Sequence, residues 1–267
     1  MITIKKLSNL KGRRALITGA TGGLGKVMAE TLAELGADLI LVDRPESDFD
    51  KLSLNLSKRW GVNVDCHACD LEQESQRKEL MASLKNDYKS INIIINNAAF
   101  VGTSDLQGWA LPFEKQTVET WRRALEVNLT AIFDICQALT PLLKKSEGAS
   151  IINIASIYGH YGPDWSLYEG TSMSNPAAYG ASKGGLIQFT RWLATTISPE
   201  VRVNVISPGG IFRNQPELFV SRYEAKTPLG RMATEDDFRG VVAYLASDLS
   251  RYVTGQNLSV DGGWGVW

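Results

Sequence analysis

The sequence predicts an α/β protein built on a doubly wound parallel sheet of about seven strands, with helices on both faces. Short apolar runs that fit buried strands alternate with longer amphipathic segments along the chain. Parallel strands need crossover connections of this length, so the alternation favours a parallel sheet. The 267 residues contain no linker, internal repeat or low-complexity tract. We therefore expect one domain over residues 1–267.

Bulk composition excludes several classes of protein. Hydrophobic residues make up 44% of the chain, enough to bury a sizeable core. The net charge is -1 and no basic run stands out, so nucleic acid is not an expected partner. The start of the chain lacks an apolar secretory segment, and no apolar run approaches membrane-spanning length. These features predict a cytoplasmic protein without a membrane partner.

The three cysteines fit neither a disulfide framework nor a metal site. Cys66 and Cys69 form a C-x-x-C pair in a segment that reads as a strand. An offset of three points the two side chains to opposite faces of a strand. A second C-x-x-C is missing and the chain has only two histidines, so no metal is expected.

A glycine-rich turn follows the first predicted strand, over 13–18. Residues 18–25 read Thr-Gly-Ala-Thr-Gly-Gly-Leu-Gly, and a helical pattern then runs to Gly36. In this context backbone N–H groups and the positive end of the helix bind phosphate, and a Cβ would obstruct its approach. A P-loop is excluded because Val27 stands where Ser or Thr is required. A merely flexible turn is the alternative.

An acidic residue ends the second predicted strand. Asp43 closes the apolar run ADLILVD and lies 18 residues after Gly25, close to where a carboxylate binds the ribose hydroxyls of NAD. A carboxylate there repels the 2′-phosphate of NADP, and the glycine-rich turn carries no basic residue ahead of Gly25. Arg44 beside it leaves NADP open. NAD is the expected cofactor, with a simple turn residue as the other interpretation of Asp43.

The middle of the chain continues the alternation. The apolar run INIIINNAA fits a central parallel strand, and its end at 96–99 lies at the carboxyl edge, where ligands bind in open α/β sheets. Asn128 in the next helix demands a hydrogen-bond partner among apolar neighbours. The other expected elements are helices over 47–60 and 72–89, a third strand ending at Asp70, a loop over 100–113 and a long helix over 114–144.

The C-terminal half completes the pattern. The fifth predicted strand, over 149–155, ends at Ser156, and a helix with Tyr179 and Lys183 follows after a long connection. The remaining expected elements are a sixth strand VRVNVIS that stops at Pro208-Gly209-Gly210, a polar stretch over 213–227, an amphipathic helix from about Thr234 and a seventh strand QNLSV.

Tyr179 and Lys183 share one face of their helix because they are four residues apart. A phenol is a poor base at neutral pH, and a nearby ammonium favours its phenolate form. Oxidation of an alcohol needs a base within reach of the hydroxyl proton while a cofactor faces the carbon. Ser156 is placed to converge on the same oxygen. A serine hydrolase is disfavoured because no Gly-x-Ser-x-Gly stands at an elbow between a predicted strand and a helix; the copy at 180–184 lies within the helix of Tyr179 and Lys183.

Several motifs therefore occur in one order along the chain. They are Thr-Gly-x-x-x-Gly-x-Gly at 18–25, Asp43, Asp70, Asn-Asn-Ala-Ala at 96–99, Asn128, Ser156, Tyr-x-x-x-Lys at 179–183 and Pro-Gly at 208–209. Together they resemble the short-chain dehydrogenase/reductase family over essentially the whole chain, in its compact single-domain branch. The resemblance implies a Rossmann-type fold and an NAD(P)-dependent enzyme that acts on CH–OH groups.

The resemblance also implies roles at the matching positions. Tyr179 would be the general acid/base, and Lys183 would hold the nicotinamide ribose and lower the tyrosine pKa. Ser156 would hydrogen-bond the substrate oxygen, and Asn128 would connect Lys183 to solvent through water. The expected cofactor contacts are Gly19, Thr21, Gly23, Leu24, Gly25, Asp43, Arg44, Asp70, Leu71, Asn97, Ala98, Tyr179, Lys183, Pro208, Gly209 and Ile211.

Two features depart from the family pattern. Many relatives have Thr where this chain has Arg213, which is expected either to be solvated or to face an anionic substrate. Ser156 and Tyr179 are 23 residues apart, more than is usual in the family, so the inserted segment over 157–177 is expected to lie over the substrate.

The composition of the inserted loops suggests a polyhydroxylated substrate. Aromatic rings among hydrogen-bonding groups suit a sugar, a sugar derivative or a polyol, whereas an acyl chain prefers an unbroken apolar wall. The alternative is that these aromatics pack the loop onto its own domain or a neighbouring subunit. The residues concerned are Tyr158, His160, Tyr161, Asp164, Trp165, Tyr168 and Glu169, with Asp105 and Trp109 in the 100–113 loop.

Two rival functions stay open. One is a 3-oxoacyl-thioester reductase that uses NADPH, which Asp43 disfavours. The other is a non-catalytic dinucleotide-binding protein, although a pure binder needs no acid/base. The family resemblance also implies a homo-tetramer or homo-dimer built on the helices over 114–144 and 174–197. Trp264 and Trp267 near the C-terminus are expected to pack on their own domain or on a partner.

Overall fold

The computed structural model describes residues 1–101 and 106–267 and contains a sheet of seven parallel strands. The strand order is β3-β2-β1-β4-β5-β6-β7, which confirms the predicted doubly wound sheet. The strands are β1 Arg14–Thr18, β2 Asp38–Asp43, β3 Val64–Ala68, β4 Ile93–Asn96, β5 Ala149–Ile154, β6 Val201–Pro208 and β7 Asn257–Val260.

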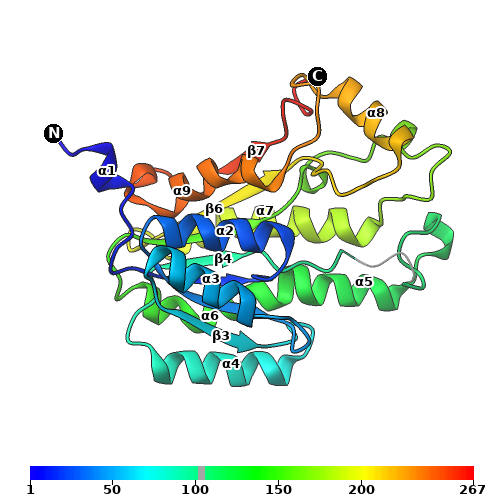
Figure 1. Cartoon of the computed structure of the whole chain (residues 1–267). Helices are drawn as coiled ribbons and strands as arrows, with labels where there is room; N and C mark the ends of the chain where they lie inside the picture. Colours follow the sequence, from blue (N-terminus) through cyan, green and yellow to red (C-terminus); the bar gives the residue numbers. More distant parts are fainter. Residues whose placement is uncertain (102–105) are drawn as a thin grey trace.

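Helices cover both faces of the sheet (Figure 1). Successive strand residues point to opposite faces, and both faces are buried, so the inner strands read as continuous apolar runs. One face packs against α4 (Glu74–Asp87), α6 (Ala131–Leu143) and α7 (Ala177–Thr196). The other packs against α2 (Gly23–Glu34), α3 (Asp50–Trp60) and α9 (Arg239–Ala246).

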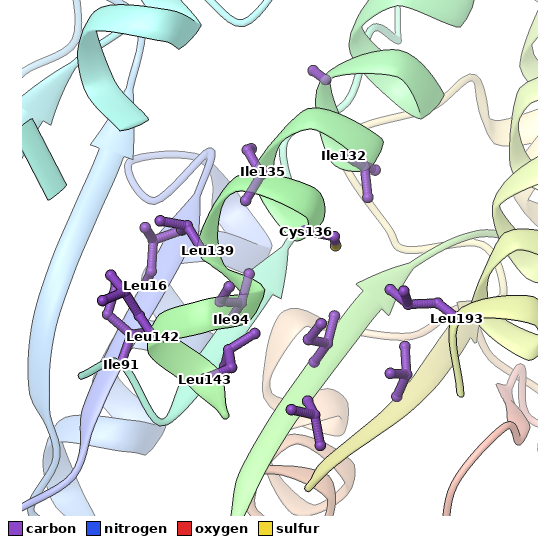
Figure 2. Packing of buried hydrophobic residues seen from close by; sticks show 14 of the residues in the cluster. Leu16, Ile91, Ile94, Ile132, Ile135, Cys136, Leu139, Leu142, Leu143 and Leu193 are labelled. Atoms are coloured by element: carbon purple, nitrogen blue, oxygen red, sulfur yellow. The ribbon is translucent and has the colours of Figure 1, made fainter. Parts of the chain in front are cut away.

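The core beneath α6 illustrates this packing. Figure 2 shows Ile135 and Leu139 of α6 beside Leu16 of β1 and Ile94 of β4. All four side chains are fully buried. Each such side chain contributes roughly 1.5–3 kcal/mol through removal of apolar surface from water. These contacts fix the carboxyl ends of β1 and β4 side by side.

The order in which strands are added to the sheet reverses between β1 and β4, although all strands run parallel. After β1 the chain adds β2 and β3 on one side, and then crosses back to place β4 on the other side of β1. Connections that leave a sheet in opposite directions open a crevice at the carboxyl ends of the strands, which is where ligands bind in this architecture.

Two segments differ from the prediction. The helix expected over 114–144 is divided into α5 (Val118–Leu125), a π-helical turn (Glu126–Thr130) and α6. The polar stretch expected over 213–227 contains a further helix, α8 (Glu217–Lys226), which lies near the C-terminus (Figure 1). Its Phe219 and Tyr223, four residues apart, form a buried face that the polar composition obscures.

The chain also begins with a short helix, α1 (Ile4–Leu7), which the sequence analysis did not predict. None of the helices in the described part of the chain is both long and apolar enough to cross a membrane.

Candidate active site

A cavity of about 760 Å³ opens at the carboxyl ends of the strands. Its walls include every residue for which the sequence analysis predicts a cofactor contact, together with Ser156. Asn128 is the exception among the predicted site residues, because it is fully buried behind the cavity wall. The cavity is thus formed by side chains from distant parts of the sequence that the topology brings to one edge.

The glycine-rich turn connects β1 to α2 along this cavity. Asn97, just after β4, donates its side-chain N–H groups to the carbonyl oxygens of Thr18 and Gly19 at 2.9 and 3.0 Å. The Thr18 hydroxyl accepts hydrogen bonds from the N–H groups of Asn97 and Ala98 at 3.1 and 3.0 Å. The ends of β1 and β4 therefore hold the turn in one conformation.

The turn has the shape that a pyrophosphate requires. Gly19 has φ +63°, in the left-handed region, and a Cβ there would lie 2.9 Å from Ala98 Cα. A Cβ on Gly25 would lie only 2.0 Å from the Gly19 carbonyl oxygen, so glycine alone fits. The turn leads into the N-terminus of α2 at Gly23, which attracts anions. These residues fit a dinucleotide.

Asp43 is held at the adjacent edge of the cavity. Its Oδ2 accepts hydrogen bonds from the Thr21 N–H and hydroxyl, both at 2.8 Å, and its Oδ1 accepts from the Arg44 N–H at 2.8 Å. The Arg44 guanidinium extends to Glu46 at 3.4 Å and is largely exposed. The carboxylate is thus fixed by the glycine-rich turn, while the neighbouring cation is directed toward a solvent-exposed acid.

Tyr179 and Lys183 lie one turn apart near the start of α7. The Lys183 Nζ is 5.8 Å from the centroid of the Tyr179 ring and donates to the Ile154 carbonyl oxygen at 2.8 Å. Lys183 is only 2% exposed, and this burial lowers the pKa of its ammonium to about 8. The helical spacing therefore produces the predicted juxtaposition.

The pKa of Tyr179 is raised in this structure, whereas the sequence analysis expected Lys183 to lower it. Burial disfavours the charged phenolate and is the main cause of the rise. The Ser156 hydroxyl and the positive charge of Arg213 act in the opposite direction. Ser156 thus lies close enough to Tyr179 to affect its pKa, although a long insertion separates β5 from α7.

Asn128 occupies the π-helical turn between α5 and α6. Its Oδ1 accepts a hydrogen bond from the Phe100 N–H at 2.6 Å, and its Nδ2 donates to the Ser182 hydroxyl at 3.0 Å. A π-helical turn shifts the register of a helix and is frequent at functional sites. Asn128 thereby joins the segment after β4 to the residue that precedes Lys183. Ser182 was not predicted as a contact.

The aromatic residues of the 157–177 insertion do not line the cavity, so of the two interpretations the structure favours packing of the loop on its own chain rather than a substrate surface. The Tyr158 and Tyr168 hydroxyls are 2.8 Å apart, and Asn175 donates to Tyr168. Both rings belong to a buried cluster, hereafter the lid cluster, which comprises Ile157, Leu167, Tyr168, Phe219, Tyr223, Met232 and Trp264, with Tyr158 packed against it. The insertion therefore packs on its own chain.

Most of the other residues predicted to form a substrate surface also contact other parts of the chain. His160 lies near Asn257 and Ser259, and the Tyr161 hydroxyl donates to the Gly265 carbonyl oxygen at 2.8 Å. Trp109 is buried and donates to the Val101 carbonyl oxygen. Asp164 forms an ion pair with Lys226 of α8, and Trp165 is more than half exposed. Asp105 lies outside the described residues.

The two tryptophans near the C-terminus differ from each other. Trp264 is buried in the lid cluster, with its ring stacked on Tyr223 at 5.9 Å between centroids. Trp267 remains exposed, although its indole N–H donates to the Lys226 carbonyl oxygen. The tail therefore packs partly on its own domain, which was one of the two expectations; the other was packing on a partner.

Arg213 lies at the glycine-rich turn instead of projecting freely into solvent. Its Nε donates to Glu235 Oε1 at 3.2 Å, and both side chains are partly exposed. Glu235 was not predicted as a site residue. It is 22 residues from Arg213 in the sequence, and no motif marks it.

Cys66 is exposed and Cys69 is buried, and both are free thiols. Burial raises the pKa of the Cys69 thiol to about 11. Within residues 1–101 and 106–267, no group of three or more His, Cys, Asp or Glu side chains is arranged to hold a metal ion.

The fold and site define a dinucleotide-binding α/β oxidoreductase, and comparison with known proteins agrees. The family model adh_short_C2, described as enoyl-(acyl carrier protein) reductase, matches residues 19–265. The 3-oxoacyl-[acyl-carrier-protein] reductase FabG of Thermotoga maritima is 31% identical over 95% of this chain and 98% of its own length.

Two solved structures are similar over nearly their whole length. A short-chain dehydrogenase from Leptospira borgpetersenii with bound NAD+ is 35% identical, with TM-score 0.83 over 99% of this chain and 97% of that chain. A gluconate 5-dehydrogenase from Burkholderia cenocepacia, in complex with NADP and tartrate, is 26% identical, with TM-score 0.86 over 99% and 100%.

The chain belongs to the short-chain dehydrogenase/reductase family. It is therefore an oxidoreductase that acts on CH–OH or C=O groups, and a nicotinamide dinucleotide is its cofactor. The expected family resemblance is confirmed.

Proposed function

We propose that the chain is an NAD-dependent oxidoreductase that interconverts a secondary alcohol and a ketone, with Tyr179 as the general acid/base. The observation that carries the choice of NAD is Asp43, fixed by two hydrogen bonds from Thr21 at the edge of the cavity. Its Oδ1, which accepts one hydrogen bond from the Arg44 N–H, can accept another from a ribose hydroxyl, whereas the negative charge of the carboxylate repels a 2′-phosphate. Arg44, the cation that could offset this repulsion, extends instead toward Glu46.

The mechanism follows from the groups that converge on the cavity. A bound nicotinamide dinucleotide would supply the hydride donor or acceptor for the substrate carbon. Tyr179 accepts the hydroxyl proton during oxidation and returns a proton to the oxygen during reduction. Ser156, which lines the same cavity as Tyr179, hydrogen-bonds the same substrate oxygen. Lys183, held by the Ile154 carbonyl oxygen one helical turn from Tyr179, binds the nicotinamide ribose.

The choice of NAD is tested by titrating tryptophan fluorescence with NADH and NADPH in the wild type and in Asp43→Ala. We expect the wild type to bind NADH more tightly and the variant to lose that preference. The expectation rests on charge repulsion, which is worth about 1 kcal/mol or more at the edge of a protein. Tighter binding of NADPH by the wild type would contradict it and favour the 3-oxoacyl-thioester reductase, the activity of the Thermotoga maritima relative.

For the substrate we propose a sugar acid, another sugar derivative or a polyol. The aromatic residues of the insertion no longer support this class, because they pack in the lid cluster. Support comes instead from the gluconate 5-dehydrogenase crystallised with tartrate, which resembles this chain over its full length. A panel of sugars, polyols and their acids with NAD, alongside acyl thioesters with NADPH, tests it. Turnover of acyl thioesters alone would reject the proposal.

We also propose that the chain assembles as a homo-oligomer, a tetramer or a dimer, through the face formed by α6 and α7. Phe133 of α6 and Trp192 of α7 are 43% and 56% exposed. Phe189 links them, because its ring lies 6.0 Å from that of Phe133 and stacks on that of Trp192 at 6.4 Å. A contiguous aromatic patch of this kind is unfavourable in water and marks an interaction site.

A further inference from the structure

Arg213 lies against the first residue of α2. Its Nη2 is 3.2 Å from the position that a Cβ on Gly23 would occupy, and its Nε donates to Glu235 Oε1. The same oxygen of Glu235 is 2.7 Å from that position. A guanidinium and a carboxylate therefore both stand where the glycine-rich turn enters the helix, at the place that the shape of the turn assigns to the pyrophosphate.

The other cations that line the described part of the cavity are engaged elsewhere. Arg44 extends to Glu46, and Arg123 binds Glu72 through its Nε at 2.5 Å. Lys183 is buried against the Ile154 carbonyl oxygen. Arg213 is thus the lining cation whose position fits a group bound at the N-terminus of α2.

We infer that Arg213 is a pyrophosphate-binding residue of the dinucleotide site, and that Glu235 orients its guanidinium while opposing the bound anion. Arginine is well suited to this task, since its planar fork pairs with two phosphate oxygens at once. Glu235 holds the fork beside Gly23, but its own negative charge repels the pyrophosphate. The inference rests on dinucleotide binding and not on the choice between NAD and NADP.

The inference predicts that substitutions of Arg213 and Glu235 change NADH affinity in opposite directions. If the two residues formed only a structural ion pair, the loss of either one would have the same effect. Arg213→Gln removes the cation, so we expect at least about tenfold weaker binding of NADH and of ADP-ribose. Binding of adenosine, which lacks the pyrophosphate, should change less than about twofold. Glu235→Gln removes the repelling charge and keeps a hydrogen-bond acceptor, so NADH should bind severalfold tighter.

Arg231 provides a matched control. It is 51% exposed, close to the 52% of Arg213, and it pairs with Asp237 as Arg213 pairs with Glu235. It does not line the cavity. Arg231→Gln should therefore leave all three affinities within about twofold of the wild type.

The affinities are measured by tryptophan fluorescence and by competition against NADH, at two salt concentrations. Anion binding by Arg213 predicts that its loss reduces the dependence of affinity on salt. The inference is overturned if Arg213→Gln binds ADP-ribose as Arg231→Gln does, or if Glu235→Gln weakens NADH binding. Failure of the wild type to bind either dinucleotide would contradict the proposed function instead. If Arg213→Gln does not fold, the NADH affinity of Glu235→Gln still tests the inference.

Discussion

At the scale of single residues, the site depends on side chains whose ordinary properties are changed by burial. Lys183 is fully buried, and the Ile154 carbonyl oxygen is its hydrogen-bond acceptor. Removing an ammonium from water disfavours its charge, so its pKa falls to about 8. The protein therefore retains a costly buried cation beside Tyr179, which is consistent with a functional role.

This burial predicts a pH-dependent stability. The folded protein binds the Lys183 proton less tightly than the unfolded chain does, so stability rises as the pH increases above about 8. Lys183→Met lacks this rise. In urea unfolding, the free energy of unfolding of the wild type should therefore increase relative to that of the variant by up to about 3 kcal/mol between pH 8 and 10.5.

Lys78→Met is the matched control for this experiment. Lys78 is 75% exposed on α4, where it pairs with Glu74 one turn away. Its replacement removes only an exposed ion pair, so the stability difference should stay within about 0.5 kcal/mol over this pH range. A constant difference between the wild type and Lys183→Met over the same range would contradict the account of Lys183.

At the scale of secondary structure, the π-helical turn between α5 and α6 supports the site through Asn128, which lies outside the cavity wall. It places Asn128 so that one amide side chain bonds both the Phe100 backbone and the Ser182 hydroxyl. Ser182 in turn donates to the Tyr179 carbonyl oxygen at 2.9 Å. The turn is therefore connected to the helix that carries Tyr179 and Lys183.

Loss of Asn128 should destabilise the fold. Asn128→Ala leaves the partly buried Phe100 N–H without its acceptor and removes the donor to the buried Ser182 hydroxyl, at a cost of about 2 kcal/mol. Urea unfolding measures this difference. Asn86→Ala on the exposed face of α4 is the control, with an expected change within about 0.5 kcal/mol. Equal stability of the two variants would show that the bonds of Asn128 contribute nothing.

The elements also show which features a sequence can and cannot predict. The seven strands and the residues at their carboxyl ends were predictable, because Gly19, Asp43, Asn97 and Ser156 each follow an apolar run with a clear end. The sequence left two interpretations of the insertion open, since the ring of Tyr158 packs on Trp264, about a hundred residues away. Such long-range packing leaves no local pattern. The pairing of Arg213 with Glu235 was hidden for the same reason.

At the scale of the whole molecule, the topology determines where the chemistry occurs. The reversal between β1 and β4 opens the cavity, and the remaining connections bring the acid/base pair on α7 to its edge. The lid cluster joins the insertion, α8 and the tail into one packed unit above this edge. Residues that are distant in sequence thereby act on one small molecule.

The proposed assembly belongs to this scale as well. Trp192→Glu places a charge in the aromatic patch of α6 and α7, so we expect it to shift the protein toward monomer in light scattering at micromolar concentration. Leu54→Glu on α3, also half exposed, should leave the oligomer intact. A wild type that is already monomeric, or a Trp192→Glu variant that still assembles fully, would rule out this face.

The central claim is that Tyr179 transfers the proton while the cofactor exchanges the hydride. The most direct test measures the wild type and Tyr179→Phe for NADH binding by tryptophan fluorescence and for turnover of alcohols and ketones by the absorbance of the reduced nicotinamide. We predict a loss of turnover of at least about a hundredfold, with NADH affinity within about twofold. Because burial raises the tyrosine pKa, oxidation by the wild type should increase toward alkaline pH. Turnover by Tyr179→Phe at the wild-type rate would contradict the account.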